Sequence, residues 1–471
     1  MEQSGTARLR LMGPADAEQQ PDVDPDLTTV AGIAPEDGRL AHPATHPDGG
    51  RARSRSEAEN EVVGFVCDLL AAPETAVGGV EQGVQAAATT VLRGARDARP
   101  TVRRPTVVLP ASAHPAWFEA AAAVGVTPLV VAVDLDGRVP VGGLTAAITP
   151  DTVLLLVSAP SWATGAIDPV PWAAAAAAVR DVPLHVDASS GGWTMAYGER
   201  LGRLRHPWDF SVPGVSSVTV ELGPDDGSAD GLVAVLHRTP DVRRDLMPDA
   251  AGQGPQESAR AWEPAGVALA DAAETCREVG HDTFARLAAD ALDAVRDLCL
   301  AVADVPGVSV AASPDATTLV LRAGAAADPF TLADTLHEQG WSAQPVLGVG
   351  HTPLLRLPVT PAMADHVDDV VEAIASASSA AQRRGRAQVD PTLDRLLAEL
   401  DPDQPSVYST QLLLGAAAAL DEHPGSGARR SAVNLLLHAA DGTSRDALLR
   451  AYREAGRRPL RRGTPRLTEQ E

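Results

Sequence analysis

An aspartate at the end of an apolar segment is the residue best placed for chemistry in this chain. Asp187 lies in the sequence HVDASSGGW (residues 185–193), directly after a segment typical of a buried strand. Parallel α/β sheets bind ligands beyond the carboxyl ends of their strands, so a carboxylate at this point could contact one. The alternative is structural, because an aspartate after a strand is often a turn or capping residue.

Lysine is absent from all 471 residues, so the 39 residues counted as Lys and Arg are all arginine. This excludes a Schiff base on a lysine ε-amine. Arginine cannot replace lysine there, because its guanidinium stays protonated and is a poor nucleophile. A composition rich in Ala, Arg, Asp, Gly and Pro is typical of a GC-rich genome. Such a genome explains few surface lysines, but it would not explain the loss of a lysine that catalysis required.

The overall charge and composition narrow the class of protein. The net charge of −23 argues against nucleic acid or an anionic membrane as the main partner. Hydrophobic residues make up 45% and aromatic residues 3%, which predicts a core of Ala, Val and Leu. No apolar segment is long enough to span a bilayer, and residues 1–20 lack the apolar core of a signal peptide. We therefore expect a cytoplasmic protein.

Other kinds of site have little support. Cys67, Cys276 and Cys299 are far apart and form no CxxC pair, so we expect free thiols and no metal site. The chain contains no GxGxxG, no GxxxxGK[ST] and no GxSxG motif, which leaves nucleotide binding and serine hydrolysis without a motif. Arg356 could bind a carboxylate, but we favour a surface or interdomain salt bridge.

Apolar segments alternate with helical patterns from residue 106 onward. Strands are predicted at 107–109, 129–133, 152–159, 184–188, 216–220 and 232–236. Helices are predicted through 120–123, near 141–148 and from Trp172. This alternation predicts an α/β fold with a mainly parallel sheet that helices cover on both faces.

The chain divides into four predicted regions. Residues 1–55 form a flexible arm, 56–256 a large domain, 257–385 a linking helix with a small α/β domain, and 386–471 a helical extension with a basic tail. Ser56 and Glu59 have the spacing of a capping box at the start of a helix. In the small domain we expect strands near 307–311, 317–322 and 354–359, and helices from Pro329 and at 362–383.

Four separated segments occur in the order found in one enzyme family. They are LPASAHPAWFEAAAAVGV (109–126), SAPSWATGAIDPV (158–170), HVDASSGGW (185–193) and WDFSVPGVSSVTV (208–220). Over about residues 40–385 the chain resembles the pyridoxal-phosphate (PLP)-dependent group II decarboxylases, most closely the sphingosine-1-phosphate lyase branch. The resemblance implies fold type I, with a large mainly parallel sheet domain, a small C-terminal α/β domain, and a homodimer whose active sites lie at the interface.

The resemblance also assigns roles to individual residues. His114 matches the histidine that stacks on the cofactor ring, and His185 and Asp187 match an HVDA motif in which the aspartate pairs with the pyridine nitrogen. Gly83 matches a glycine of the loop that binds the cofactor phosphate. The alternative for His114 is a histidine at a helix start without a catalytic role.

The chain departs from the family where covalent chemistry takes place. Pro224 stands at the position of the Schiff-base lysine and Gly223 at that of the preceding histidine. Asp225 and Gly227 replace two tyrosines, and Asp230 replaces a second lysine. In the phosphate loop, residues 82–86 (QGVQA) replace Ser-Gly-Gly-Thr-Glu, so both hydroxyl donors are lost.

These departures predict a degenerate homologue without covalent PLP catalysis. Such a protein would act by binding, or as a partner subunit, in a homodimer or in a heterodimer with an active paralogue. PLP is then a cofactor by family resemblance only. The alternative is a carbon-carbon or carboxy-lyase, similar to an amino-acid decarboxylase or a sphingosine-phosphate lyase, that works with noncovalent PLP or without PLP.

Overall fold

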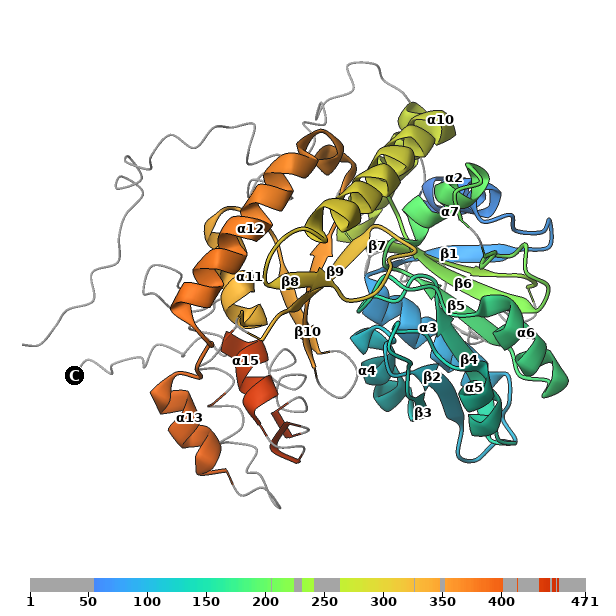
Figure 1. The fold of residues 1–471 in the computed structure, drawn as a ribbon. Coiled ribbons are helices and arrows are strands. Elements are labelled where there is room, and N and C mark those ends of the chain that lie inside the picture. The colour runs from blue at the N-terminus through green and yellow to red at the C-terminus, as the bar shows by residue number, and fades with distance from the viewer. Residues whose placement is uncertain are drawn as a thin grey trace, which may run out of the picture.

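The protein was studied as a computed structural model. The structure describes residues 55–204, 206–223, 231–240, 263–325, 327–347, 352–400, 413, 432–440, 443–445 and 447–448. Two sheet-containing units lie side by side and share one long helix, α10 (Glu263–Val302) (Figure 1). The predicted N-terminal arm, up to residue 54, and the predicted basic tail lie outside the described residues.

The large sheet has seven strands in the order β1-β7-β6-β5-β4-β2-β3. The strands are β1 (Val77–Gln82), β2 (Thr106–Pro110), β3 (Thr127–Val131), β4 (Thr152–Ser158), β5 (Leu184–Ala188), β6 (Val215–Glu221) and β7 (Leu232–His237). Strands β2 to β6 pair in parallel, whereas β7 is antiparallel to both β1 and β6. The prediction of a mainly parallel sheet is therefore confirmed.

The central strands β4 and β5 are apolar along most of their length because helices bury both of their faces. Every residue of β4 and β5 is buried, which is the continuous apolar pattern expected of parallel strands covered by helices. Strand β1, with the sequence VGGVEQ, was not predicted, because its glycines weaken any strand pattern. A Cβ at Gly78 would collide with the Leu236 side chain, so the close approach of β1 to β7 requires glycine there.

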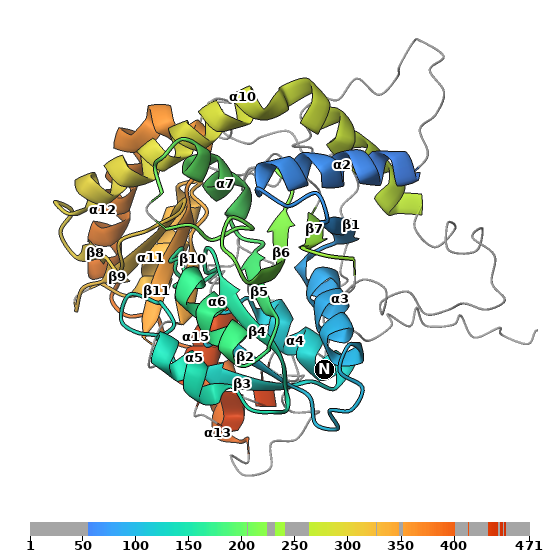
Figure 2. The same cartoon turned by 90° about the vertical axis from the view of Figure 1, so that its right-hand side faces the viewer.

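Helices cover both faces of the large sheet. On one face lie α3 (Val84–Asp97) and α4 (Pro115–Val124), which share an apolar core with β2, β4 and β7. On the other lie α2 (Arg55–Leu69), α5 (Val141–Ala147), α6 (Val170–Val179), α7 (Gly192–Arg200) and the first part of α10. Figure 2 shows α2, α7 and α10 together above the sheet.

The predicted capping box at the start of α2 was wrong. The helix begins at Arg55, so Ser56 lies inside its first turn and not at the cap. Glu59 instead extends toward the sheet, where its Oε1 accepts the backbone N–H of Val80 at 3.0 Å. The carboxylate therefore fastens α2 to the edge strand β1.

An aromatic cluster fixes α2, α7 and α10 to one another. Phe65 stacks on His281 with ring centroids 4.0 Å apart, and Trp193 meets the edge of Phe284 at 5.1 Å. The Tyr197 hydroxyl lies 2.9 Å from His281 Nδ1. Aromatic rings are few in this chain, and their concentration here anchors the long helix to the large sheet.

The small unit has a four-stranded antiparallel sheet in the order β10-β11-β9-β8. Its strands are β8 (Val308–Val310), β9 (Thr318–Ala323), β10 (Gln344–Leu347) and β11 (Pro353–Pro358), of which β10 was not predicted. The covering helices are the end of α10, α11 (Pro329–Glu338), the 3₁₀-helix η2 (Pro361–His366) and α12 (Val367–Arg384). Helices α13 (Pro391–Ala398) and α15 (Ala432–Ala439) follow with a small apolar core of their own.

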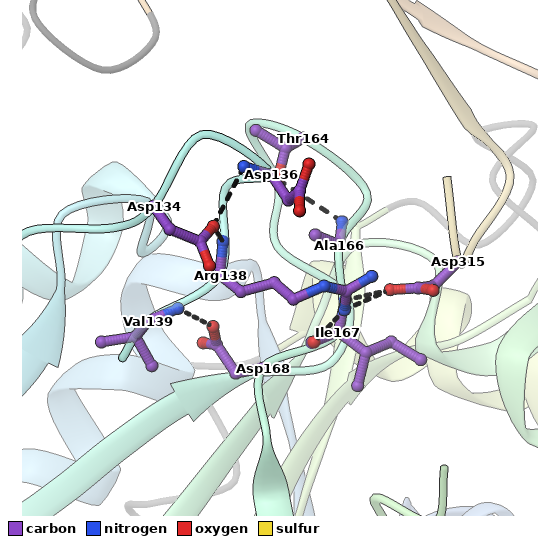
Figure 3. A network of polar contacts seen from close by, with 9 residues as sticks. All are labelled: Asp134, Asp136, Arg138, Val139, Thr164, Ala166, Ile167, Asp168 and Asp315. Carbon is purple, nitrogen blue, oxygen red and sulfur yellow. Dashed lines mark hydrogen bonds and ion pairs between the residues drawn. The ribbon is translucent and has the colours of Figure 1, made fainter. Parts of the chain in front are cut away.

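A polar network joins the two units close to the ends of the parallel strands. Arg138 Nη1 lies 2.5 Å from Asp315 Oδ2, and the same carboxylate oxygen accepts the N–H of Ile167 at 2.8 Å. Figure 3 shows the Arg138 guanidinium pointing toward Asp315 from the turn that follows β3. Asp168, directly after Ile167, is buried and accepts the N–H groups of Val139 and Ser158, each at 2.8 Å. The network holds the small unit against the end of β4.

Candidate functional site at the carboxyl edge of the large sheet

Asp187 lies near the end of β5, buried with 3% of its surface exposed. Its Oδ1 accepts the backbone N–H of Ser189 at 3.1 Å, which is the turn contact considered as the structural alternative. Its Oδ2 accepts the indole N–H of Trp117 at 2.7 Å. Both carboxylate oxygens therefore have partners within the chain.

Trp117 is a functional candidate that the sequence did not reveal. It lies on the buried face of α4, fully enclosed, with its ring centroid 4.8 Å from that of His185. In the sequence PAWFEAAAAV it resembles any apolar residue on a core-facing helix. Nothing in the local sequence indicates that its N–H donates to a residue 70 positions later. Only the packing of α4 on β5 brings the indole to Asp187.

His185 belongs to the interior of the sheet. Its Nδ1 lies 2.7 Å from Ser217 Oγ and its Nε2 lies 2.6 Å from Thr219 Oγ1, so both ring nitrogens bond to hydroxyls of β6. Burial lowers the pKa of His185 well below its ordinary value, and the nearby His237 lowers it further. The ring is therefore neutral and links β5 to β6; its predicted place in a cofactor site stays a prediction.

His114 caps α4. Its Nδ1 accepts the N–H of Ala116 at 3.2 Å, so a neutral ring carries its proton on Nε2. Burial lowers the pKa of His114 below its ordinary value; Asp187 opposes this shift and Arg356 adds to it. His114 therefore stands at a helix start, where its ring caps α4.

The small unit contributes Arg356 from β11. Its Nε donates to the main-chain oxygen of Trp162 at 2.9 Å, and its guanidinium carbon lies 5.5 Å from the centroid of the Trp162 ring. The same Trp162 ring meets His114 edge-on at 5.6 Å. A hydrogen bond and a cation–π contact thus link Arg356 to Trp162, and the predicted salt bridge stays a prediction.

Three serine hydroxyls lie buried at this edge without a hydrogen-bond partner among the residues that the structure describes: Ser112, Ser158 and Ser189. Ser158 ends β4 and is the register partner of Asp187, and Ser189 follows Asp187 in the turn. Ser112 comes two residues after the end of β2 and two before His114. Buried hydroxyls are normally satisfied by protein or by a bound molecule, so this edge offers unused hydrogen-bonding capacity.

The predicted phosphate loop forms the start of α3. Gly83 is the N-cap with φ 82°, and its N–H donates to the carbonyl of Gly231 at 2.6 Å. No side chain caps the helix. One terminal atom of the Gln85 amide lies 3.0 Å from Glu119 Oε2. A carboxylate therefore lies near the helix start where the family resemblance implies an anionic phosphate.

The altered lysine loop is described only at its two ends. Gly223 lies two residues after the end of β6 with φ 87°, and Gly231 directly precedes β7 with φ 69°. Pro224, Asp225, Gly227 and Asp230 lie outside the described residues. The loop that would carry a Schiff-base lysine thus connects β6 to β7.

The described residues lack two other features, a group suited to a metal ion and a membrane-spanning helix. No group of three or more His, Cys, Asp or Glu side chains there could hold a metal ion, and all three cysteines are free. Among the described helices, none combines the length and the apolar character needed to cross a membrane.

The chain is similar in sequence to sphingosine-1-phosphate lyases and to probable amino-acid decarboxylases. No protein-family model matches it. A sphingosine-1-phosphate lyase of Arabidopsis thaliana is 27% identical over 304 residues, covering 60% of this chain and 54% of that protein. A probable L-tyrosine/L-aspartate decarboxylase of Methanothermobacter thermautotrophicus is 26% identical over 310 residues, covering 63% of this chain and 80% of that protein. The chain thus spans about half the length of the curated lyases it matches.

Solved structures agree with this fold. A Burkholderia pseudomallei sphingosine-1-phosphate lyase superimposes with a TM-score of 0.61 at 24% identity, covering 70% of this chain and 78% of that chain. An Oryza sativa TDC determined with PLP and tryptamine gives a TM-score of 0.56 at 16% identity, covering 69% and 76%. At these identities the likeness establishes the fold, which is that of fold-type-I PLP enzymes.

The residues present do not fit a covalently bound PLP. None of the 471 residues is a lysine. Asp187, the predicted partner of a pyridine nitrogen, already accepts an indole N–H at one oxygen and a backbone N–H at the other. The start of α3 lacks hydroxyl side chains from Gln82 to Ala86. The residues therefore fail to fit PLP at three points: there is no lysine for the Schiff base, Asp187 is already bonded, and the phosphate loop has no hydroxyl donors.

Proposed function

We propose that this chain, which belongs to the family of PLP-dependent group II decarboxylases and sphingosine-1-phosphate lyases, is a degenerate member that acts by binding and not by covalent PLP catalysis. The site of binding is the carboxyl edge of the large sheet, around Asp187 and His114. The chain keeps the fold of this family, but it has no lysine that could form the Schiff base.

The observation that carries the proposal is the set of buried serine hydroxyls at this edge. Ser112, Ser158 and Ser189 have no partner among the described residues, although each is at least nine-tenths buried. An unsatisfied buried polar group costs about 1–3 kcal/mol of stability. A bound molecule that hydrogen-bonds to these hydroxyls removes that cost, so the edge is suited to a polar ligand.

The surrounding residues define what such a ligand meets. Burial keeps the His114 imidazole neutral near pH 7, with its proton on Nε2, so it can donate one hydrogen bond without carrying charge. The serine hydroxyls both donate and accept. Arg356, held over Trp162, supplies the positive charge of the small unit at this edge.

The direct test is whether the purified protein carries a Schiff base. Borohydride treatment reduces an internal aldimine to a stable phosphopyridoxyl adduct, which peptide mass mapping then locates. We expect no adduct on any internal residue and no visible absorption from an internal aldimine. An adduct on an internal side chain would contradict the proposal.

Assembly is part of the same proposal. By analogy with fold-type-I enzymes, the chain would form a homodimer, or a heterodimer in which it completes the site of an active paralogue. The support is the retention of the family scaffold in both units. Light scattering of the purified chain should report a dimer, whereas a monomer that stays monomeric when mixed with a lysine-bearing paralogue would contradict this.

A second function is supported by one specific observation. Asp187 and His114, the ring contacts implied by the family resemblance, lie at the same edge of the sheet. They favour a lyase or decarboxylase that uses noncovalent PLP, or no PLP. Release of CO₂ from an amino acid, or cleavage of a phosphorylated sphingoid base, by a preparation without aldimine would favour this alternative over binding alone.

A further inference from the structure

We propose that Trp117 determines the specificity of this site: its indole N–H occupies the oxygen of Asp187 that would otherwise receive a protonated ring nitrogen. The site then disfavours pyridinium-type ligands, noncovalent PLP included, because the ring nitrogen must compete with the indole for Oδ2. The inference deepens the proposed function and rests on it only in assigning Asp187 to the ligand site. It concerns the noncovalent fit of a ring, which is independent of lysine.

The hydrogen bond has the geometry of a strong contact. The distance from Trp117 Nε1 to Asp187 Oδ2 is 2.7 Å, at the short end of the range for N–H donors to ionised oxygens. Both residues are buried, so water does not compete for either partner. With Ser189 on Oδ1, each oxygen of the carboxylate has one donor in the folded chain.

The indole is also held in place from its own helix. Trp117 is the third residue of α4, and α4 is fixed by the His114 cap at its start and by Gly125, with φ 72°, at its end. The ring lies against His185, which in turn bonds to two hydroxyls of β6. Displacing the indole therefore means moving a fully buried ring out of a close-packed core.

A neutral donor and a cationic donor differ at this position. A pyridinium brings a positive charge that compensates the Asp187 carboxylate, whereas an indole N–H satisfies the oxygen without adding charge. A ring nitrogen must therefore share Oδ2 with the indole N–H or displace it, and either outcome weakens its binding. The buried serines and His114 stay available, so the site retains hydrogen bonding for uncharged polar groups while it loses the ring-nitrogen contact.

The test uses 4-deoxypyridoxine 5′-phosphate, which has a pyridine ring and a phosphate but no aldehyde. Trp117→Phe removes the N–H and keeps an aromatic ring. The matched control is Trp208→Phe, because Trp208 is also fully buried and its Nε1 has no partner among the described residues. By calorimetry we expect Trp117→Phe to bind the probe about tenfold or more tighter than the wild type, with Trp208→Phe unchanged.

Adding Asp187→Asn to Trp117→Phe should abolish the gain, because the carboxylate that receives the ring nitrogen is then gone. An equal affinity of Trp117→Phe and Trp208→Phe would overturn the inference, as would tight probe binding by the wild type. Because the probe forms no aldimine, these outcomes are separate from the borohydride result that tests the proposed function.

A second measurement does not depend on the stability of the Trp117 variant. In the wild type with ¹⁵N-labelled tryptophan, one of the seven indole signals should lie downfield, because its N–H donates to a carboxylate. Asp187→Asn should move that signal upfield and leave the others in place. If no indole signal responds to Asp187→Asn, the proposed contact is absent in solution.

Discussion

The two faces of the large sheet hold buried tryptophans in opposite ways. On the face of α2, α7 and α10, Trp193 is held by rings alone: it contacts Phe65, Tyr197 and Phe284, and its Nε1 has no partner among the described residues. On the face of α4, Trp117 is held by a charge, because its Nε1 donates to Asp187. Both rings are nine-tenths or more enclosed.

This difference separates packing from chemistry. Ring contacts on the α10 face stabilise the fold through apolar burial and need no polar group. The α4 face instead keeps a carboxylate, two histidines and several hydroxyls in its interior, each of which costs free energy unless it is satisfied. A core built only for stability would have fewer such groups, so the polar edge is where a function is to be sought.

The largest expected effect lies on the apolar face. Trp193→Ala should lower the free energy of unfolding by about 3–5 kcal/mol, because it leaves a cavity among Phe65, Tyr197 and Phe284. Urea denaturation measures the loss. Trp193→Phe is the matched control and should cost clearly less, since it keeps a ring in the cluster.

The cluster around Trp193 should not affect cofactor chemistry, because it lies on the opposite face of the sheet from Asp187. Neither Trp193→Ala nor Trp193→Phe should form an aldimine, as is expected for the wild type. If Trp193→Ala lowered the free energy of unfolding by less than about 1 kcal/mol, the rings would not anchor α10, and the contrast between the two faces would be wrong.

The same contrast explains what the sequence could predict. Strand β5 was predicted with its observed bounds, and β4 to within one residue, because strands buried on both faces carry a continuous apolar pattern. Asp187 was found because it follows such a strand, and the large sheet together with the small unit followed from the alternation of elements. Local pattern and family resemblance were sufficient for these features.

Features that depend on contacts between distant segments were missed. Strand β1 approaches β7 closely at Gly78, where a Cβ would meet Leu236, and its own sequence does not favour a strand. Trp117 reaches Asp187 only in the folded protein, where its side chain contacts β5. The buried serines stand out only because their hydroxyls have no hydrogen-bond partner among the described residues. Neither kind of information is present in residue spacing.

A smaller effect, which depends on pH, is expected at the polar edge. Asp168 supports this edge: it accepts the N–H groups of Val139 and Ser158, and its own N–H donates to the Ser158 carbonyl at 2.9 Å. Burial raises the pKa of Asp168 from 3.8 to about 6, although these hydrogen bonds and the nearby Arg138 oppose the shift. The folded protein therefore holds this proton more tightly than the unfolded chain does.

The sign of the pH dependence follows from that difference. Between the two pKa values the unfolded chain has released the proton and the folded chain has kept it, so the contribution of Asp168 is fully present below about pH 4 and is lost as the pH rises through about 6. The loss amounts to about 2 kcal/mol between about pH 4 and about pH 7.5. Asp168→Asn cannot titrate. The wild-type free energy of unfolding, measured relative to that variant by urea denaturation, should therefore fall by this amount over the range.

Trp193→Phe is the control on the opposite face. Because Trp193 has no titratable group, the difference in free energy of unfolding between the wild type and Trp193→Phe should stay constant with pH. If the difference between the wild type and Asp168→Asn were also constant with pH, the two faces would not differ in their electrostatics.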